Sequence, residues 1–513
     1  MKKKILIGLS WPYANARLHI GHVASSLPAD VLARFHRGIG NDVSFVSGSD
    51  CYGTPILVRA RDEGTTPEKV AKKYHEFHAE DFRRLGFSFD NYTHTMTKAH
   101  LDFVKEFHAQ MYDGKYVYEK TAPQLHCEAC NQFLPDRYVF GICPHCDKQA
   151  KGDSCDFCSK ILEPEDLKNP QCLLCKGTPK LKDQTQLYLK MSALQDKMQK
   201  FYDERKHTWT TNAAGLVGRY LKEGLRDRAI TRSMEWGVPV PREGWDDRRI
   251  YVWMENVLGY MSASKTKFAT GDMHYYVHAK DNIPFHAIIL PAILMANEKK
   301  KYHLPDVIVS SEYITVNGEK ISKSKGNQID ACALYEKFDV DMVRYYFLRT
   351  VSDKRDSNFT LQDFVNVVNG ELVNNFGNLV NRTLSFAKTK LEDKRVMLVQ
   401  DKEIKAKIRE AKNEIHELLW QGQVSRALGR AMELVNFGNK YFDDCKPWLS
   451  IKTDVNTCAQ NISEVIAIII ACTELLKPFI PFACEKVLTW LAGDKIGDID
   501  ILFKRLDIKE VTI

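Results

Sequence analysis

The sequence predicts an α/β protein in three parts: a domain built on a parallel β-sheet, a cysteine-rich insertion within that domain, and a bundle of α-helices after it. Three observations predict this organisation. The N-terminal residues alternate strand and helix patterns, eight cysteines form four Cys-x-x-Cys pairs, and from about residue 360 the chain shows nearly continuous helical periodicity. A chain of 513 residues is long enough for several such domains.

The first 50 residues predict a strand, a helix and a second strand. An apolar run at residues 4–9 ends at Trp-Pro-Tyr, which predicts a buried strand followed by a turn. Apolar residues then recur at spacings of three and four from His19 to the Gly-Ile-Gly sequence that begins at Gly38, and a second apolar run covers residues 43–46. Strand, helix and strand of these lengths form a βαβ unit, and hence the parallel sheet of a Rossmann-type domain.

The predicted strand ends locate a candidate site. Ligands on parallel sheets bind beyond the carboxyl ends of the strands, where residues 10–22 and 47–54 fall. The same pattern resumes after the cysteines, with apolar runs at residues 249–253, 275–278 and 307–309. We therefore expect functional side chains to follow these runs.

The composition, 44% hydrophobic and 27% charged, is that of an ordinary water-soluble protein. A net charge of +7 permits a polyanionic partner without requiring one.

The apolar run behind the N-terminal lysines is too short for a secretion signal. The longest apolar stretch, Val465 to Cys472, falls short of the ~20 residues of a membrane span and is predicted as a buried helix. We expect a cytoplasmic protein without a membrane partner.

The cysteine pairs predict metal binding. They are Cys127/Cys130, Cys143/Cys146, Cys155/Cys158 and Cys172/Cys175. Eight thiolates match two tetrahedral zinc sites, since in a reducing cytosol such pairs favour metal over disulfides. Four thiolates leave no open ligand position, so the zinc is expected to be structural rather than catalytic. The spacing leaves the connectivity open between a sequential and a nested arrangement.

A short histidine motif follows the first strand. His19 and His22 are three residues apart and would share one face at the start of the predicted helix. A helix N-terminus offers phosphates its backbone N–H groups and the positive end of its dipole. Gly21 would let a flat base pack on the backbone, and Asn15 adds a donor. The alternative is two ordinary surface histidines, but the strand before and the helix after favour a nucleotide site.

A basic segment at residues 320–325 lies much later in the chain and is flanked by glycines. Lysines alternate with hydroxyls there, with Lys320 at its start and Lys323 followed by Ser324. Such a loop can close over a triphosphate and stabilise the charge that develops as pyrophosphate leaves. The alternative is a solvated loop, which is the usual fate of a short basic run.

Aromatic and ionisable residues gather at the predicted strand ends. They are Trp11, Tyr13, Asp50, Trp253, Tyr260 and His286. Asp50 suits an ammonium group, and the rings suit a polarizable thioether, since each sulfur–ring contact contributes ~0.3–1.5 kcal/mol. The alternative is an aromatic core, which is equally favoured for Trp253 alone because tryptophan is highly buried on average.

The helical C-terminal third contains an unusual asparagine-rich segment. Residues 374–382 include four asparagines, although asparagine is a poor helix former. Asn378 and Arg382 share a helix face, and Pro447 and Trp448 lie on a later helix. Amide, guanidinium and indole groups commonly bind unstacked RNA bases. The alternative, capping and packing, is favoured for each residue taken alone.

Five segments together resemble the methionyl-tRNA synthetase family of class I aminoacyl-tRNA synthetases. They are PYANARLHIGH (12–22), SGSDCYGTPI (47–56), YVWMENVLGY (251–260), AKDNIPFH (279–286) and KISKSKGN (320–327). The first and last correspond to the HIGH and KMSKS signatures of that class. The resemblance extends over essentially the whole chain.

The resemblance implies a ligase that forms a carbon–oxygen bond. It would activate L-methionine with Mg²⁺-bound ATP to methionyl-adenylate, transfer the methionyl group to the 3′ end of tRNA(Met), and release AMP and diphosphate. The residues implied as catalytic are His19, His22, Lys320 and Lys323. Those implied to bind ATP are Asn15, His19, Gly21, His22, Lys323 and Ser324.

The resemblance also implies further site residues. The six residues at the strand ends, Trp11 to His286, would form the methionine pocket. The residues implied to read the CAU anticodon are Asn378, Arg382, Pro447 and Trp448. The zinc connectivity would be nested, with the inner cysteines 143, 146, 155 and 158 on one ion and the outer four on the other. Departures from the family pattern at Asn256, Val257 and Asn282 indicate a different pocket subtype, and the serine after Arg232 replaces the aspartate of the family segment that Arg232 matches.

Five segments follow from this interpretation. We predict a first half of the catalytic domain at 1–118, a zinc-knuckle insertion at 119–225, the second half at 226–319, the lysine loop with a stem-contact region at 320–362, and an anticodon-binding helical domain at 363–513. Because the chain ends after these helices, without the dimerising domain of many bacterial relatives, we expect a monomer.

Two other classes of protein share part of the pattern. A different nucleotidyl transferase would have the histidine and lysine motifs but not the pocket or the asparagine-rich helix. A zinc-dependent RNA-binding protein would explain the cysteines but neither nucleotide motif.

Overall fold

The computed structural model describes residues 2–155, 157–158, 160–321, 326–391, 401–493 and 495–510. The chain forms two compact units. The first contains residues 1–18, 39–83 and 88–311, and the second contains residues 19–38, 84–87 and 312–513.

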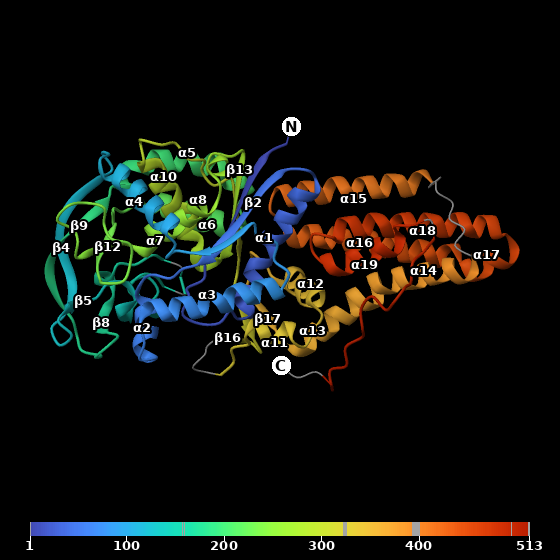
Figure 1. Ribbon diagram of the computed structural model, residues 1–513, viewed down its shortest axis with the longest axis horizontal. Coiled ribbons are helices and arrows are strands. Elements are labelled where there is room, and N and C mark those ends of the chain that lie inside the picture. Colours follow the sequence, from blue (N-terminus) through green and yellow to red (C-terminus); the bar gives the residue numbers. More distant parts are fainter. Residues whose placement is uncertain are drawn as a thin grey trace. The chain divides into compact units, whose positions relative to one another are not determined.

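A five-stranded parallel sheet forms the centre of the first unit, with the order β14-β13-β1-β2-β3 (Figure 1). The strands are β1 (Lys4–Leu9), β2 (Asp42–Ser49), β3 (Asn91–His94), β13 (Met273–Ala279) and β14 (Val307–Ser311). β1 pairs in parallel with both β2 and β13, and α1 (Ile20–Gly38) joins β1 to β2 along the chain. The parallel sheet predicted from the strand–helix–strand pattern is therefore confirmed.

The first unit also contains α-helices. They are α2 (Thr54–Asp62), α3 (Pro67–Arg84), α4 (Lys98–Tyr112), α5 (Gln195–Arg205), α6 (Thr211–Glu223), α7 (Val252–Glu255), α8 (Gly259–Ala263), α9 (Thr266–Ala269) and α10 (Leu290–Ala296). A π-helical turn, η7 (Phe285–Ile289), runs directly into α10. Wide turns of this kind are frequent at functional sites.

One predicted strand is wrong in part. The run at 249–253 forms β12 (Arg248–Ile250), which pairs antiparallel with β11 (Thr231–Ser233) outside the main sheet, and the chain turns into α7 at Val252. A short apolar run does not distinguish a buried strand from a buried helix. The consequence is that Trp253 projects from a helix turn rather than a strand.

The cysteine-rich insertion stands on a long antiparallel hairpin formed by β4 (Val117–Cys127) and β9 (Lys180–Leu189), with β5 (Gln132–Phe133) and β10 (Arg228–Ala229) at its edges. The segment between the two long strands forms a small sheet. Its strands are β6 (Val139–Ile142), β7 (Gln149–Lys151) and β8 (Lys168–Cys172).

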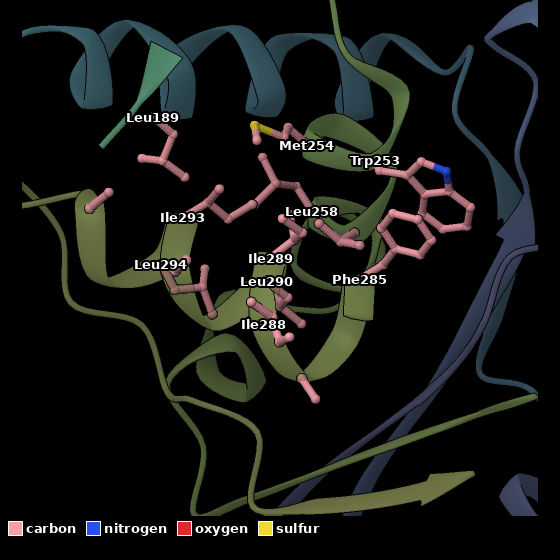
Figure 2. Packing of buried hydrophobic residues seen from close by; sticks show 14 of the residues in the cluster. Leu189, Trp253, Met254, Leu258, Phe285, Ile288, Ile289, Leu290, Ile293 and Leu294 are labelled. Atoms are coloured by element: carbon pink, nitrogen blue, oxygen red, sulfur yellow. The ribbon is translucent and has the colours of Figure 1, made fainter. Parts of the chain in front are cut away.

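The largest core of the first unit lies under the pocket residues. Figure 2 shows Leu258, Ile289 and Ile293 packed together, with the Trp253 and Phe285 rings face to face at the edge of the same cluster. The pocket therefore rests on closely packed aliphatic side chains.

The second unit contains α1, a sheet of three short strands and the later helices. The strands are β15 (Ile314–Val316), β16 (Glu319–Lys320) and β17 (Ser357–Phe359). Asn317 and Gly318 both have positive φ in the two-residue turn between β15 and β16, which suits a tight hairpin. That turn places Lys320 at the end of β16.

The helices of this unit, besides α1, form the C-terminal bundle (Figure 1). They are α11 (Ala331–Tyr335), α12 (Val340–Thr350), α13 (Leu361–Val367), η9 (Val368–Gly377), α14 (Asn378–Lys390), α15 (Lys402–Trp420), α16 (Val424–Cys445), α17 (Pro447–Thr453), α18 (Val455–Leu476) and α19 (Pro481–Leu491). The apolar residues that recur at helical spacing along α13, η9 and α14 are all buried: Val365, Val368, Leu372, Phe376 and Leu379.

Helix α18 is the one described helix that is long and apolar enough to cross a membrane by length and composition. Of its most apolar window, 72% is buried inside the structure, and it packs along α16. The prediction of a buried helix at Val465–Cys472 is confirmed.

Candidate active site and metal centres

The carboxyl ends of β1 and β2 are tied together around Asp50. The Asp50 amide donates to the Pro12 carbonyl (2.9 Å), and its carbonyl accepts from the Ala14 amide (2.7 Å). Asp50 Oδ1 accepts from the Tyr52 amide at 3.1 Å, and the side chain is fully buried. A buried carboxylate is costly unless a donor or a cation accompanies it, so this position suits a positively charged ligand group.

Glycines clear the space for Trp11 beside this carboxylate. A Cβ at Gly48 would lie 2.6 Å from the indole of Trp11 and 2.5 Å from the Thr93 carbonyl oxygen, and one at Gly259 would lie 2.7 Å from the same indole. The Trp11 ring meets Tyr260 edge-on with centroids 6.3 Å apart. Only glycine at these two positions allows that contact.

Tyr260 and His286 form the most strongly defined polar contact of the pocket. His286 Nδ1 donates to the Asn282 carbonyl (2.9 Å), so Nε2 is the acceptor of the Tyr260 hydroxyl at 2.6 Å. Burial lowers the pKa of His286 to about 4 and raises the pKa of Tyr260 well above its ordinary value. Both groups are therefore neutral at pH 7 and form a fixed, uncharged wall.

Trp253 forms a second wall. Its ring stacks on Phe285 (Figure 2) at a centroid distance of 3.8 Å and an interplanar angle of 7°. The Tyr13 ring meets the Trp253 ring edge-on at 5.9 Å. Tyr13 also bridges to Asp50. All six predicted pocket residues are thus linked by contacts in one place. Phe285 was not predicted, although it directly precedes His286.

A buried hydrogen-bond chain behind Trp11 was also missed. His100 Nε2 lies 2.7 Å from Glu255 Oε2, and His100 Nδ1 lies 2.8 Å from the Ser262 hydroxyl. Burial lowers the pKa of His100 to about 3 and raises the pKa of Glu255 well above its ordinary value. Both pKa shifts are explained if Glu255 is protonated and donates its hydrogen bond to Nε2 of a neutral His100. The pair joins residues 155 positions apart, which no local pattern signals.

Asn256, which departs from the family pattern, and Arg232, which precedes a departing serine, are both buried in the first unit. The Asn256 amide is 1% exposed, and neither its nitrogen nor its oxygen has a partner in the described part of the chain. Arg232 is also buried, donates to Asp136 Oδ1 at 3.0 Å and lies 4.0 Å over the Tyr251 ring. Arg232 therefore connects the cysteine-rich insertion to the residues that lead into Trp253.

The predicted nucleotide motif lies at the start of α1 in the second unit. The His19 amide donates to His22 Nδ1, and the Gly21 amide donates to His19 Nδ1, both at 3.1 Å. With Nδ1 accepting, the proton of each neutral ring is on Nε2. Burial lowers the pKa of His19 to about 4 although Asp330 opposes the shift, so His19 is a neutral donor rather than a cation. Asn15 lies before this motif in the first unit, its amide bonded to the Tyr13 carbonyl.

Ile329 and Asp330, which precede α11, contact the start of α1. The Ile20 amide donates to the Ile329 carbonyl (3.0 Å), and His19 bridges to Asp330. Lys320 is exposed, with its ammonium 5.5 Å from the Tyr313 ring. Lys323 and Ser324 lie outside the described residues, so their predicted roles stay predictions.

The eight paired cysteines form two groups of four. Cys127, Cys130, Cys172 and Cys175 make one group, and Cys143, Cys146, Cys155 and Cys158 make the other, with the sulfurs of each within 4.8 Å of one another. Sulfur–sulfur distances such as 3.5 Å and 3.8 Å in the inner group fit a zinc ion, since four Zn–S bonds of about 2.3 Å place tetrahedral sulfurs about 3.8 Å apart. The grouping agrees with the nested connectivity implied by the resemblance.

The backbone around the cysteines supports the metal interpretation. In each of the three pairs for which the structure describes the residue directly after the second cysteine, that residue has positive φ: Asn131 (47°), Asp147 (54°) and Lys176 (63°). Left-handed turns at non-glycine residues are uncommon, and here they turn backbone N–H groups toward sulfur, as the Gly177 amide does to Cys175 Sγ (3.4 Å). Such donors stabilise thiolates, the form that binds metal.

The predicted RNA-reading residues do not share one environment. Arg382 donates to Asp443 (2.6 Å) and to Asn439 (2.9 Å and 2.8 Å), and its guanidinium lies 4.2 Å from the Phe442 ring. Asn378 is exposed on α14, and Trp448 is 47% exposed at the start of α17, whereas Pro447 is buried. Thus Asn378 and Trp448 are accessible, while Arg382 is held in place.

Comparison with known proteins gives consistent results. The sequence matches the family model described as tRNA synthetases class I (M) over residues 5–384, and the one described as the anticodon binding domain of methionyl tRNA ligase over residues 393–500. It is 40% identical to methionine–tRNA ligase 1 of Alkaliphilus oremlandii over 529 residues, covering 98% of each chain, and 40% identical to methionine–tRNA ligase of Bacillus anthracis over 532 residues, covering 99% of this chain and 97% of the relative.

A solved structure shares the fold. Mycobacterium tuberculosis methionyl-tRNA synthetase in complex with methionyl-adenylate aligns with a TM-score of 0.83 at 22% identity, over 98% of this chain and 100% of the other.

Proposed function

The chain belongs to the methionine-specific family of class I tRNA synthetases, and we infer from this that it catalyses the ATP-dependent ligation of methionine to tRNA(Met). The observation that carries the inference is the linked pocket at the ends of β1 and β2, where a buried carboxylate is enclosed by aromatic rings. A pocket of this chemistry suits an amino acid with a free ammonium group and a thioether side chain.

In this proposal the pocket residues bind and orient methionine. Asp50 receives the ammonium group, because its carboxylate is buried at the ends of β1 and β2 and carries the opposite charge. The rings of Trp253 and Tyr13 surround the side chain, and the neutral Tyr260–His286 pair closes the pocket without adding charge. An uncharged wall suits an uncharged thioether and disfavours amino acids with ionised side chains.

The activation step needs charge stabilisation rather than a protein nucleophile. The methionine carboxylate oxygen attacks the α-phosphorus of ATP, and the bond to the bridging oxygen breaks to release pyrophosphate. His19 and His22 donate Nε2–H hydrogen bonds to the phosphates from the start of α1. Because His19 is neutral, the positive charge comes from Lys320 and Lys323, together with Mg²⁺ bound to ATP.

The transfer step consumes the adenylate. A ribose hydroxyl at the 3′ end of tRNA attacks the methionyl carbonyl carbon, and the bond to the phosphate oxygen breaks to release AMP. The accessible side chains Asn378 and Trp448 are proposed to contact the anticodon, with Arg382 and Pro447 supporting them.

The two cysteine groups are proposed to bind one structural zinc ion each. Metal binding supplies folding free energy to a loop-rich segment that has a small apolar core of its own. We further propose that the protein acts as a cytoplasmic monomer, which sedimentation analysis would test.

Amino-acid-dependent ATP–pyrophosphate exchange tests the proposal directly. Methionine is expected to support exchange, whereas leucine and cysteine are not; exchange with either of these instead would refute the methionine assignment. Lys323→Ala is expected to keep methionine binding and to lose most of the exchange activity. Unchanged exchange in that variant would refute the role given to the lysine loop.

A further inference from the structure

Arg344 is a charged side chain with no solvent exposure. It lies on α12, and its guanidinium Nη2 donates to Asp30 Oδ2 on α1 at 2.7 Å, while its Nε donates to the Phe479 carbonyl at 2.9 Å. Longer hydrogen bonds reach the carbonyls of Leu85 and Pro478, each at 3.3 Å. A buried guanidinium is tolerated only when it is paired and hydrogen-bonded in this way.

Asp30 is equally buried and is held from two sides. Its Oδ2 also accepts from Arg34 Nε at 2.8 Å, and Arg34 Nη2 donates to the Gly86 carbonyl at 2.7 Å. Three residues before Arg344 on the same helix, Asp341 accepts from the Ala483 amide at 2.6 Å. The Asp30 carboxylate therefore has one defined position, which is set by the planar guanidinium of Arg344 on α12.

This contact joins two regions that are distant in sequence. Asp30 belongs to the helix whose first turn carries His19 and His22. Phe479 and Ala483 flank the start of α19, within the part of the chain that matches an anticodon binding domain. Arg344 is thus a direct tie between the histidine helix and the C-terminal bundle.

The position of Asp30 along α1 makes this tie relevant to the histidines. Asp30 is eleven residues beyond His19, or about 16 Å along a helix axis, so a tilt of about 4° at Asp30 moves the histidine end by about 1 Å. Pro28 lies between the two and lacks the N–H that would bond to the preceding turn. The orientation of the first turn therefore depends on what holds the residues on either side of Pro28.

We propose that Arg344 is a positioning residue for the nucleotide motif: by fixing Asp30 it sets the orientation of α1 relative to the bundle, and so places His19 and His22 for phosphate binding. The inference rests on the proposed function, because it gives those histidines their role. Misplacement of reacting groups by about 1 Å can cost about 10²-fold in rate. Methionine binding, which uses other residues, is expected to be independent of Arg344.

Two variants test the position rather than the presence of the ion pair. Arg344→Lys keeps the charge but cannot form the planar fork. Asp30→Glu keeps the pair but lengthens the side chain by one methylene, about 1.5 Å. Arg430→Lys is the matched control, since Arg430 lies in the same bundle and binds Glu433 at 3.2 Å on the bundle surface. Circular dichroism melting establishes that each variant is folded at the assay temperature.

The readout is methionine-dependent ATP–pyrophosphate exchange without tRNA. We expect kcat to fall at least tenfold in Arg344→Lys and in Asp30→Glu, KM for methionine to stay within twofold, and the control to match the parent protein. Should Arg344→Lys fail to fold, Asp30→Glu decides by the same criteria. A folded variant with kcat within twofold of the parent, or a methionine KM that rises as kcat falls, would overturn the proposal. Absence of methionine-dependent exchange in the parent protein would instead overturn the proposed function.

Discussion

The hydrogen bond between Tyr260 and His286 permits a sharp test of the pocket, because a second tyrosine offers a close control. Tyr260→Phe removes the hydroxyl that donates to His286 Nε2 at 2.6 Å. The Nδ1 proton stays bonded to the Asn282 carbonyl, so Nε2 becomes a buried acceptor without a donor. Leaving one buried polar group unpaired costs about 1–3 kcal/mol of unfolding free energy.

Tyr276→Phe is the matched control. Tyr276 is also fully buried and its ring contacts Tyr260, but its hydroxyl is 3.4 Å from His274 Nδ1. That distance is longer than a normal hydrogen bond, so the interaction contributes little. We expect this variant to lose less than about 0.5 kcal/mol, within the range of a weak or absent bond.

Urea unfolding followed by tryptophan fluorescence measures the stability difference, and exchange kinetics measure the functional one. Tyr260→Phe is expected to be the less stable variant by about 1–2 kcal/mol and to raise KM for methionine about tenfold, the equivalent of about 1.4 kcal/mol. Tyr276→Phe is expected to leave KM unchanged. Equal stability of the two variants, or equal methionine KM, would refute the assignment of Tyr260 and His286 as a fixed pocket wall.

The remaining predictions concern packing, metal and pH. Gly48→Ala should lower the free energy of unfolding measured in urea by about 1–3 kcal/mol, because its Cβ would lie 2.5 Å from a backbone oxygen. The control variant Gly215→Ala, on an exposed helix face, should not lower it. Cys143→Ser and Cys127→Ser should each lower bound zinc by one ion per chain in metal analysis; loss of both ions from either would contradict two independent groups. Burial lowers the pKa of seven described histidines to about 3 or 4, so the unfolded state takes up protons first and stability should fall as pH falls from 6.5 to 4. A urea midpoint that stays constant over that range would contradict the buried neutral histidines.

The parallel sheet could be predicted because its signals are local. Apolar runs, helical spacing and glycine stops each depend on a few neighbouring residues, and the βαβ connection leaves few alternatives. The placement of Trp11, Tyr13 and Asp50 followed from the rule that ligands bind at strand ends. The same reasoning failed at residues 251–255, because a short buried run has no period that separates strand from helix.

The parts that sequence reasoning missed are contacts between distant residues. His100 and Glu255 become partners only because α4 and α7 meet in the fold. The resemblance implied a base-reading role for Arg382. In the structure, Arg382 Nη1 donates to the Asp443 carboxylate and Nη2 donates to Asn439, which lies 57 positions away. These hydrogen bonds hold the guanidinium in one orientation. Residue spacing and composition cannot predict that orientation.

The structure gives Gly21 a different role from the one that the sequence predicts, and a glycine is required for either role. Sequence reasoning assigned it to contact with a flat base, since it lacks a side chain. In the structure the His19 ring folds back over it, and a Cβ there would lie 2.9 Å from His19 Cε1 and 3.0 Å from His19 Nδ1. The Gly21 amide donates to that same nitrogen. Glycine is therefore required to fix the tautomer and the direction of His19, which makes the first turn of α1 a preorganised donor before any nucleotide binds.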